Sequence, residues 1–475
     1  PRVLIAMTLT AAEVASVERS TAPLPRFVQF LDTVSVLLLG TAAVLTVGDG
    51  VRFDIAGVQV SVTSPARVFV WAALAIIVRH VMHATTPLPV RAWTWSRRRI
   101  AWPDVSFVTQ LVVATRIPPV LIGLLAVATI GLGGDMRYQA YASPWLNLPA
   151  RWDAYWYSEI AAFGYTWDGD WTRQQSVVFF PAFPMAARVV ARLLGIHVLY
   201  AAWFVSFAAF AAAMLLFVRL ARAHLDTRSA SDAAWLLAAY PFAVYFSAAY
   251  SESLFLLTMC GMFLAVQEQR FERAAMWGLL AGLTRPNGWL LAVPLVLLVH
   301  THLRSSRPRE WLRAAALVSA PVAGVLLYTL YLHLVFGDGF AWLRGQAAWG
   351  RTFRGLHLFA MDRISYIAEY GLSHYLTTDP FDALNSGAAL LALGLIVPIA
   401  RRMGAAYGAL VAVLALPPLL IGGSMSMGRI TSVLFPMFIW LAADVPAKYR
   451  VGLLIAFATL QGFAAALFFT WRPLF

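Results

Sequence analysis

The sequence is almost without cysteine and poor in charge. Cys260 is its only cysteine, so the chain forms no intrachain disulfide, thiolate metal site or redox pair, and we expect this thiol to pack in an apolar core. Only 12% of the residues are charged and 60% are hydrophobic, which is unlike an ordinary soluble domain. With a mean hydropathy of +0.71, the composition indicates a polytopic membrane protein.

Lysine is equally scarce. Lys448 is the only one, so arginine supplies nearly all of the positive charge. In a soluble domain a formal net charge of +13 would suggest a nucleic-acid partner, but these arginines occupy short segments between apolar runs. They are topology signals, and we expect no nucleic acid to bind.

Long apolar runs recur along nearly the whole chain. Each has about 16 to 27 residues, close to the roughly 20 that a helix needs to cross a bilayer. They lack the polar alternation of barrel strands, so we expect an all-α polytopic membrane protein with about 11 to 13 transmembrane helices. The runs are Val28–Val47, Ala66–Met82, Ser106–Leu132, Tyr200–Val218, Ala233–Ala249, Ser253–Val266, Ala314–Phe336, Gly387–Ala400, Ala405–Ile421, Ile430–Ala443 and Val451–Thr470.

Arginine-rich segments orient these helices, because short loops rich in arginine stay in the cytoplasm. Counting spans between the segments exports two long loops, 133–178 and 337–386, and the turn 422–429. The arginine-rich segments are 91–99, 304–313, 401–402 and 448–450.

The middle of the chain allows two topologies. In the one we prefer, residues 179–194 lie at the membrane interface and the helix breaks near Arg285, which exports both Glu252 and Arg285. In the other, 179–194 and 274–301 are each a single span. The first keeps more arginines in the cytoplasm.

The stretch RWDAYWYSEIAAFGY, residues 151–165, sets two carboxylates among aromatic rings. We expect an amphipathic helix from near Leu148, with one apolar stripe and with Asp153 and Tyr157 together on a neighbouring face. Such a helix lies on the outer leaflet and holds Asp153 at the mouth of any cavity between the spans. An interfacial anchor with a solvated carboxylate is the alternative. The stripe consists of Trp152, Trp156, Ile160 and Phe163.

Two other acidic motifs differ in what they predict. In YSESLF, Glu252 stands between apolar runs, where a carboxylate is costly and therefore paired, facing a cavity or functional. In YTWDGDW, Asp168 and Asp170 have the spacing of a sugar-nucleotide metal motif, but the same residues favour a simple turn, which we prefer. The histidines show no zinc-site spacing, and we expect no metal.

Several polar residues fall at helix breaks or in exported loops. LTRPNG combines a proline break with Arg285 and Asn287, and backbone of this kind is tolerated in a membrane where it lines a wet cavity or is buried in protein. Exported arginines run against the positive-inside rule and need a reason, which a phosphorylated lipid or anionic headgroups would supply. The exported residues of interest are Gln346, Trp349, Arg351, Arg354 and Arg429.

These motifs resemble the PIG-V family of membrane mannosyltransferases, which belongs to the GT-C class of glycosyltransferases. The matching pieces are RWDAYWYSEIAAFGY, FFPAFP, YSESLF, GLTRPNG and GRITSVLFP, in the family's order from about Arg151 to Pro436. The resemblance implies a GT-C-type bundle with amphipathic helices in the first outer loop, an essential acidic residue there, here Asp153, and a polyprenyl-phosphate sugar, mannose in eukaryotic members, as donor.

Roles for the residues follow from that chemistry. A base must take the proton of the acceptor hydroxyl while cations hold the departing phosphate, in a metal-independent inverting displacement without a cofactor. Asp153 is the candidate base, and Glu252 either shares that task or orients the acceptor. The donor phosphate would bind Arg285, Arg351 and Arg429. Other candidates for substrate binding are Arg151, Trp152, Trp156, Tyr157, Asn287, Gln346 and Trp349.

We expect the chain to have four parts, of which the N-terminal pair of helices lies outside the resemblance. We expect an accessory pair of helices at 1–104, a GT-C-like catalytic core at 105–336 with the outer loop 133–178, a second outer loop at 337–386, and C-terminal helices at 387–475. The segment 48–64, GDGVRFDIAGVQVSVTS, alternates enough for a small β-hairpin. The acceptor would be a glycan, lipid or protein, at the outer face of a bacterial inner membrane.

A lipid or glycolipid flippase remains the alternative. It too would need a polar cavity, the buried Glu252 and phosphate-binding arginines. Transporters often carry paired halves with broken helices in corresponding positions, whereas this chain shows one break near its middle.

Overall fold

The computed structural model describes residues 26–47, 51–55, 58–62, 65–82, 102–133, 138–302 and 308–474. The chain divides into two compact units, residues 1–102 and 103–475.

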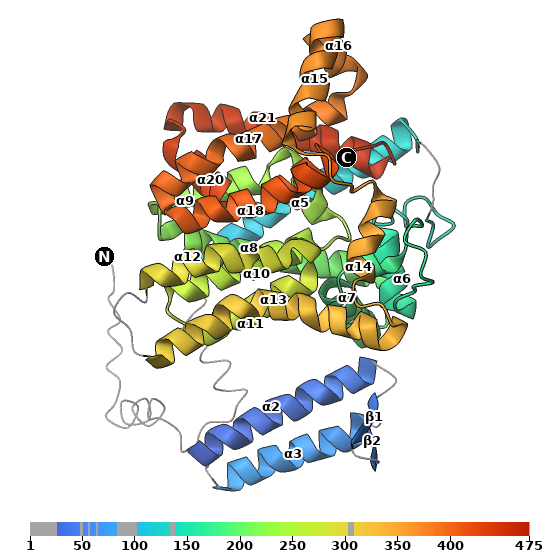
Figure 1. Ribbon diagram of the computed structural model, residues 1–475, viewed down its shortest axis with the longest axis vertical. Coiled ribbons are helices and arrows are strands. Elements are labelled where there is room, and N and C mark those ends of the chain that lie inside the picture. Colours follow the sequence, from blue (N-terminus) through green and yellow to red (C-terminus); the bar gives the residue numbers. More distant parts are fainter. Residues whose placement is uncertain are drawn as a thin grey trace, which may run out of the picture. The chain divides into compact units, whose positions relative to one another are not determined.

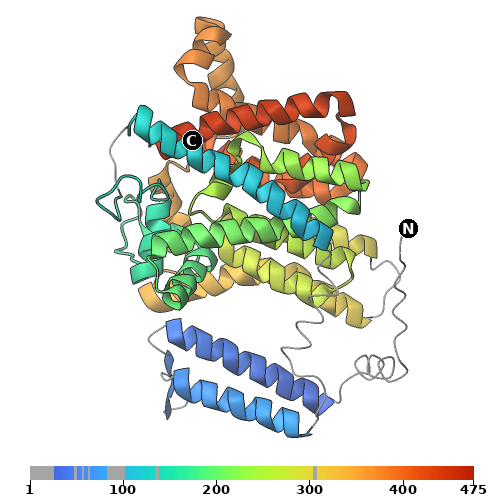
Figure 2. The ribbon, with the colours of Figure 1, turned by 180° about the vertical axis from the view of Figure 1, so that it is seen from behind.

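The first unit is a helical pair closed by a hairpin. Helices α2 (Arg26–Val47) and α3 (Pro65–Met82) lie side by side in both views (Figures 1 and 2). Between them β1 (Val51–Ile55) and β2 (Val58–Val62) pair antiparallel, which confirms the hairpin expected from the alternating pattern. Arg79 donates from Nε to Oδ1 of Asp32 across the pair, at 2.8 Å.

The regular secondary structure among the described residues of the second unit is all helical, which confirms the all-α polytopic class. By length and composition, six helices of its described part can cross a membrane, and the bent pair η2 (Pro241–Ser247) and α10 (Glu252–Gln267) would make a seventh. The expected total of about 11 to 13 stays a prediction. The six are α5 (Trp102–Thr129), α8 (Val198–Arg222), α13 (Pro308–Phe336), α17 (Pro380–Met403), α18 (Ala405–Gly422) and α21 (Ala447–Phe469).

Two of the expected spans are wrong as single helices, and proline is the reason in both. The run Ala233–Ala249 is divided into α9 (Thr227–Ala238) and η2, which begins at Pro241. The run Ile430–Ala443 is divided into α19 (Met427–Ser432) and α20 (Phe435–Asp444), with Pro436 in the first turn of α20. Proline fits a first turn and disrupts a helix interior, so each apolar run becomes two short elements.

The break at Arg285 is confirmed. Helix α11 (Phe271–Thr284) ends one residue before it, η3 (Pro286–Leu291) follows, and α12 (Ala292–His302) continues the apolar run. Helix α7 (Ala182–Leu194) has 13 residues, too few to span a bilayer, in keeping with the interfacial position preferred for 179–194.

One buried cation holds the middle of this unit together. Arg116 of α5 is almost fully buried and donates to the carbonyl oxygens of Ala238 and Ala243 and, at 3.1 Å, to Oγ of Ser247. These carbonyls belong to the end of α9 and to η2, where regular helix bonding stops and acceptors would otherwise lack partners. Figure 2, the view from behind, shows α5, in cyan, crossing the other helices of this unit.

The polar segments between the long helices form short elements. Helix α6 (Ala154–Phe163) and η1 (Ser176–Val178) follow α5, and α14 (Ala341–Arg344) and η4 (Gly345–Trp349) follow α13. Helices α15 (Leu356–Tyr370) and α16 (Leu372–Thr378) project from the stacked long helices (Figure 1).

Candidate functional site

Asp153 stands at the N-terminal end of α6 and is not used to cap it. We expected the helix to begin near Leu148, but it begins at Ala154, because Trp152 has a φ of 50° and turns the chain there. The backbone nitrogen of Asp153 donates to Oη of Tyr250 at 3.0 Å. Its carboxylate points away from the helix end and accepts a bond from Nη1 of Arg429 through Oδ2 at 2.5 Å.

Glu252 is the first residue of α10 and is completely buried. Its Oε1 accepts bonds from both Arg285 and Arg429. Its other oxygen, Oε2, has no hydrogen-bond partner among the described residues. A buried carboxylate is tolerated when cations compensate its charge, which the two guanidinium groups do here.

Arg429 joins the two acids into one cluster. The residue lies in α19, 276 residues after Asp153 and 177 after Glu252. Its guanidinium lies 4.6 Å from the ring centre of Tyr250, so one aromatic face covers it. We call Asp153, Glu252, Arg285 and Arg429 the charge cluster. The side chains of Asp153, Arg285 and Arg429 are 13–18% exposed, so the cluster is accessible from one side.

Arg351 lies beside the cluster without an acidic partner. It follows η4, its guanidinium is close to Gly422, and among the described residues it forms no ion pair. Burial, followed by the positive charges of Arg429 and Arg285, lowers the pKa of Arg351 to about 10. A half-buried cation held near two other cations is a receptor for an anion.

Aromatic rings from both polar loops form a wall near Asp153. Trp156 of α6 stacks on Phe179 with ring centres 5.8 Å apart, and Trp349 of η4 contacts both rings at 5.5 and 5.4 Å. The indole nitrogen of Trp349 is buried without a partner among the described residues, as is Oδ1 of Asn287. Unbonded buried polar atoms are rare, and a ligand that bonds them is one explanation.

We expected Tyr157 to share a helix face with Asp153. It is buried on α6, four residues after Asp153, and its Oη lies 2.9 Å from Oγ of Ser251. The predicted stripe is altered, however, because Ile160 is buried while Phe163 is 81% exposed. The buried face of α6 runs through Tyr157 and Ile160 instead.

The other three predicted binding residues have different surroundings. Arg151 is almost fully buried and donates to backbone carbonyls, including that of Phe469 at 2.7 Å, so it fixes the loop to the end of α21. Trp152 packs on Trp471 with ring centres 5.0 Å apart. Gln346 is half-buried in η4.

The Asp168 and Asp170 motif is an exposed turn. Oδ1 of Asp168 accepts from the backbone nitrogen of Asp170 at 2.9 Å, and Arg173 forms ion pairs with both carboxylates. This is the self-bonding of an Asx turn, as the preferred interpretation had it.

Sequence reasoning missed three neighbours of Glu252. Tyr250 bonds to the backbone of Asp153 and covers Arg429, Ser251 bonds to Tyr157, and Tyr245 has a buried hydroxyl with no partner among the described residues. Tyr250 and Ser251 stand in YSESLF itself, so their position next to Glu252 was the available signal.

One family of known proteins matches part of the chain. The family model "Mannosyltransferase (PIG-V)" matches residues 134–337, a segment that contains Asp153, Glu252 and Arg285. A search of curated proteins finds no match.

Solved structures show a more distant likeness. The apo crystal structure of the oligosaccharyltransferase of Archaeoglobus fulgidus is 12% identical, with a TM-score of 0.44 over 80% of this chain and 57% of that one. The oligosaccharyltransferase AglB of the same organism, bound to an inhibitory peptide and a dolichol-phosphate, is 12% identical, with a TM-score of 0.39 over 80% and 56%. The chain therefore spans just over half the length of these structures. Residues 134–337 of this integral membrane protein are therefore similar to the glycosyltransferases of the PIG-V mannosyltransferase family.

Proposed function

We propose that the protein transfers a sugar, mannose in the first instance, from a polyprenyl-phosphate donor to an acceptor hydroxyl. The observation that carries this proposal is that two groups lie close together. One is a partly exposed carboxylate, Asp153, and the other is an arginine, Arg351, that forms no ion pair among the described residues. A base and an anion receptor side by side are what this reaction needs.

The chemistry is a single displacement. The acceptor oxygen attacks the anomeric carbon of the donor, the bond from that carbon to the phosphate oxygen breaks, and its electron pair leaves with the phosphate. Oδ2 of Asp153 is bonded to Arg429, which leaves Oδ1 to accept the proton of the acceptor hydroxyl. The ion pair fixes the orientation of Asp153, so the base is positioned before the substrates arrive.

The phosphate binds on the cationic side of the same cluster. Arg351 supplies a guanidinium whose charge is not neutralised, and Arg285, which is 16% exposed, supplies a second. Phosphate binding there neutralises like charges that now repel each other. Paired donors on two arginines also stabilise the charge that develops on the leaving phosphate.

Glu252 acts through the arginines. Because its side chain is completely buried, it does not reach a substrate, and both cations that it bonds are those that face the site. We therefore assign it a positioning role instead of a share of the base chemistry. The unbonded nitrogen of Trp349 and Oδ1 of Asn287 are the groups that we expect to bond sugar hydroxyls.

The active face is the extracytoplasmic one in this proposal. The arginine-rich loops hold the opposite ends of the helices in the cytoplasm, and in a bacterium the enzyme would sit in the inner membrane. The donor and acceptor would then meet at the outer leaflet, with the acceptor a glycan, lipid or protein.

The test is sugar transfer by the purified protein. The parent and Asp153→Asn are incubated with a panel of radiolabelled polyprenyl-phosphate sugars, and transfer and release of the sugar are counted. Glu159→Gln, an isosteric change on the same helix away from the charge cluster, is the matched control. We expect sugar release by the parent and the control and its loss in Asp153→Asn. If the parent moves labelled lipid across liposomes and cleaves none of it, the flippase alternative replaces this proposal.

A further inference from the structure

A polar pocket opens next to the charge cluster. It has a volume of about 500 Å³ and lies between the loop before α15, the first turns of α15 and α17, and the loop after α18. A volume of this size is within the range of small-molecule sites, roughly 300–1,000 Å³. No function has been given to it so far.

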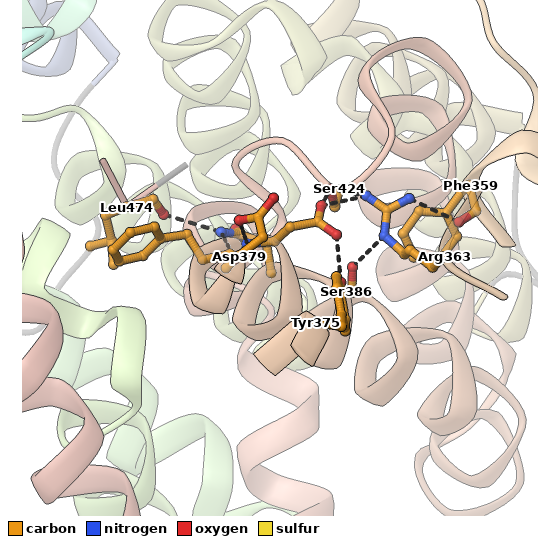
Figure 3. A network of polar contacts seen from close by, with 11 residues as sticks. Phe359, Arg363, Tyr375, Asp379, Ser386, Ser424 and Leu474 are labelled. Carbon is orange, nitrogen blue, oxygen red and sulfur yellow. Dashed lines mark hydrogen bonds and ion pairs between the residues drawn. The ribbon is translucent and has the colours of Figure 1, made fainter. Parts of the chain in front are cut away.

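The wall of this pocket is rigid because its polar groups bond one another. Arg363 donates to Asp382 and, at 2.5 Å, to Oγ of Ser424, and Tyr375 donates to the second oxygen of Asp382, also at 2.5 Å. Figure 3 shows Arg363 between Ser424, Ser386 and the backbone of Phe359. Arg363 and Asp382 each have several partners, so this wall keeps one shape.

Three other charged side chains of the pocket are available to a ligand. Arg354 and Asp362 form no ion pair among the described residues. Asp379 uses one oxygen, Oδ1, to accept a hydrogen bond from the backbone nitrogen of Asp382 at 3.1 Å. The rim therefore offers a fork of donors and carboxylate acceptors at fixed places. Groups that both donate and accept, such as adjacent sugar hydroxyls, bond such a rim fully.

Charge separates this pocket from the phosphate site. Its lining carries two arginines and three aspartates, so it is weakly negative, whereas the charge cluster with Arg351 has three arginines against two acids. An anionic phosphate is drawn to the cluster and is disfavoured in the pocket. The pocket suits a neutral, hydroxyl-rich ligand.

The pocket and the cluster share structural members. Gly422 lines the pocket and lies against the guanidinium of Arg351. Asn385, also in the lining, accepts a hydrogen bond through Oδ1 from the backbone nitrogen of Gly428 at 2.8 Å. Gly428 directly precedes Arg429 in the chain. A ligand in the pocket therefore lies beside the group that we assign to the donor phosphate.

We infer that this pocket binds the sugar acceptor, and that the acceptor presents a neutral polyhydroxylated head, such as a glycan or polyol. The role of this ligand as the acceptor rests on the proposed function. The binding of a polyhydroxylated ligand to the pocket does not. Arg354, Asp362 and Asp379 bond the hydroxyls, and the Arg363 and Asp382 pair holds the wall against which the head group lies.

The experiment measures binding without turnover. The protein in nanodiscs free of sugar detergent is mixed with methyl mannoside, methyl glucoside and methyl galactoside, and saturation transfer from protein to sugar is recorded by NMR. We expect a signal from at least one hexoside and a fall of at least fivefold in Asp362→Ala and in Arg354→Ala. Glu369→Gln, on α15 outside the pocket, and Arg344→Gln, in α14, should keep the parent signal.

Two results would overturn the inference directly: no signal from any hexoside, or an equal signal in the parent and in both pocket variants. A third is complete displacement of the sugar by octyl phosphate, if this displacement requires Arg354. The last would make the pocket an anion site. Because sugar release from the donor is measured separately, failure of the proposed function and failure of this inference are different results.

Discussion

Nη1 of Arg429 lies 2.5 Å from Oδ2 of Asp153, although 276 residues separate them in the chain. The pair ties the exported segment before α6 to α19, and it orients the only carboxylate of the charge cluster that is open to a substrate.

Replacing Asp153 by Asn should reduce sugar transfer by about 10²- to 10⁴-fold, the range for loss of a general base. Asn keeps the shape and can still contact Arg429, so donor binding should change much less. Steady-state transfer with labelled donor measures both. Activity within tenfold of the parent would show that Asp153 is not the base.

Arg351→Gln should raise the KM for the donor roughly tenfold or more, because it removes a charged hydrogen-bond donor to the phosphate, worth about 1.5 to 3 kcal/mol. Thermal stability should stay at the parent level, since Arg351 has no ion pair among the described residues to lose. An unchanged KM with unchanged Tm would remove Arg351 from the site.

The pKa of Arg351 predicts a pH effect in the parent. A cation with a pKa lowered to about 10 is charged below that pH and loses its charge above it. Donor kcat/KM should therefore fall as pH rises from 9 to 11, and the same limb should be absent in Arg351→Gln. A pH–rate profile of both proteins over that range decides the point.

Arg429→Gln should destabilise the protein by about 3 to 5 kcal/mol, because it leaves Asp153 and the buried Glu252 without their shared cation. The double variant Arg429→Gln with Glu252→Gln should recover part of the loss, since the uncompensated charge is removed as well. Thermal unfolding in one lipid environment measures both variants. Equal stability of Arg429→Gln and the parent would mean that the ion pairs contribute nothing.

Arg116→Met should also destabilise the protein, although it contacts no member of the charge cluster. It orphans the carbonyls of Ala238 and Ala243, at roughly 1 to 3 kcal/mol each. Val113→Ala, on an exposed position of the same helix, is the control. A Tm difference from the control of less than about 2 °C would contradict a bracing role.

Cysteine labelling tests the orientation. Ser251 and Thr284 are buried and unsuitable, but Thr172, Ser373 and Thr227 are exposed. A cysteine at Thr172 or Ser373 should react with an impermeant maleimide in intact cells, and one at Thr227, close to the arginines in the last turn of α8, only after lysis. The native Cys260 is buried and should give little background. The reverse pattern would place the site in the cytoplasm.

The sequence was sufficient to find all four residues of the charge cluster. Asp153, Glu252, Arg285 and Arg429 stand out because ionised groups are costly among apolar runs, and this cost is a property of the residue and its neighbours alone. The helix break at Arg285 and the hairpin at 48–64 were visible for the same local reason, in proline and in alternation.

The bonding partners of the arginines could not be predicted from the sequence. Arg151 and Arg351 look alike in sequence, yet one donates to carbonyls of the backbone and the other has no ion pair among the described residues. Arg116 was hidden in an apolar run, and the pocket before α15 is built by segments far apart in the chain. Such features depend on tertiary contacts that no local pattern encodes.

The long separation within the charge cluster also bears on biosynthesis. Glu252 is made 177 residues before Arg429 and 33 before Arg285, so each acid leaves the ribosome ahead of its cations. Until α19 is inserted, Asp153 is without the guanidinium that it bonds in the finished protein. Arg429, in α19, is therefore needed to compensate two acids that the ribosome has already delivered to the membrane.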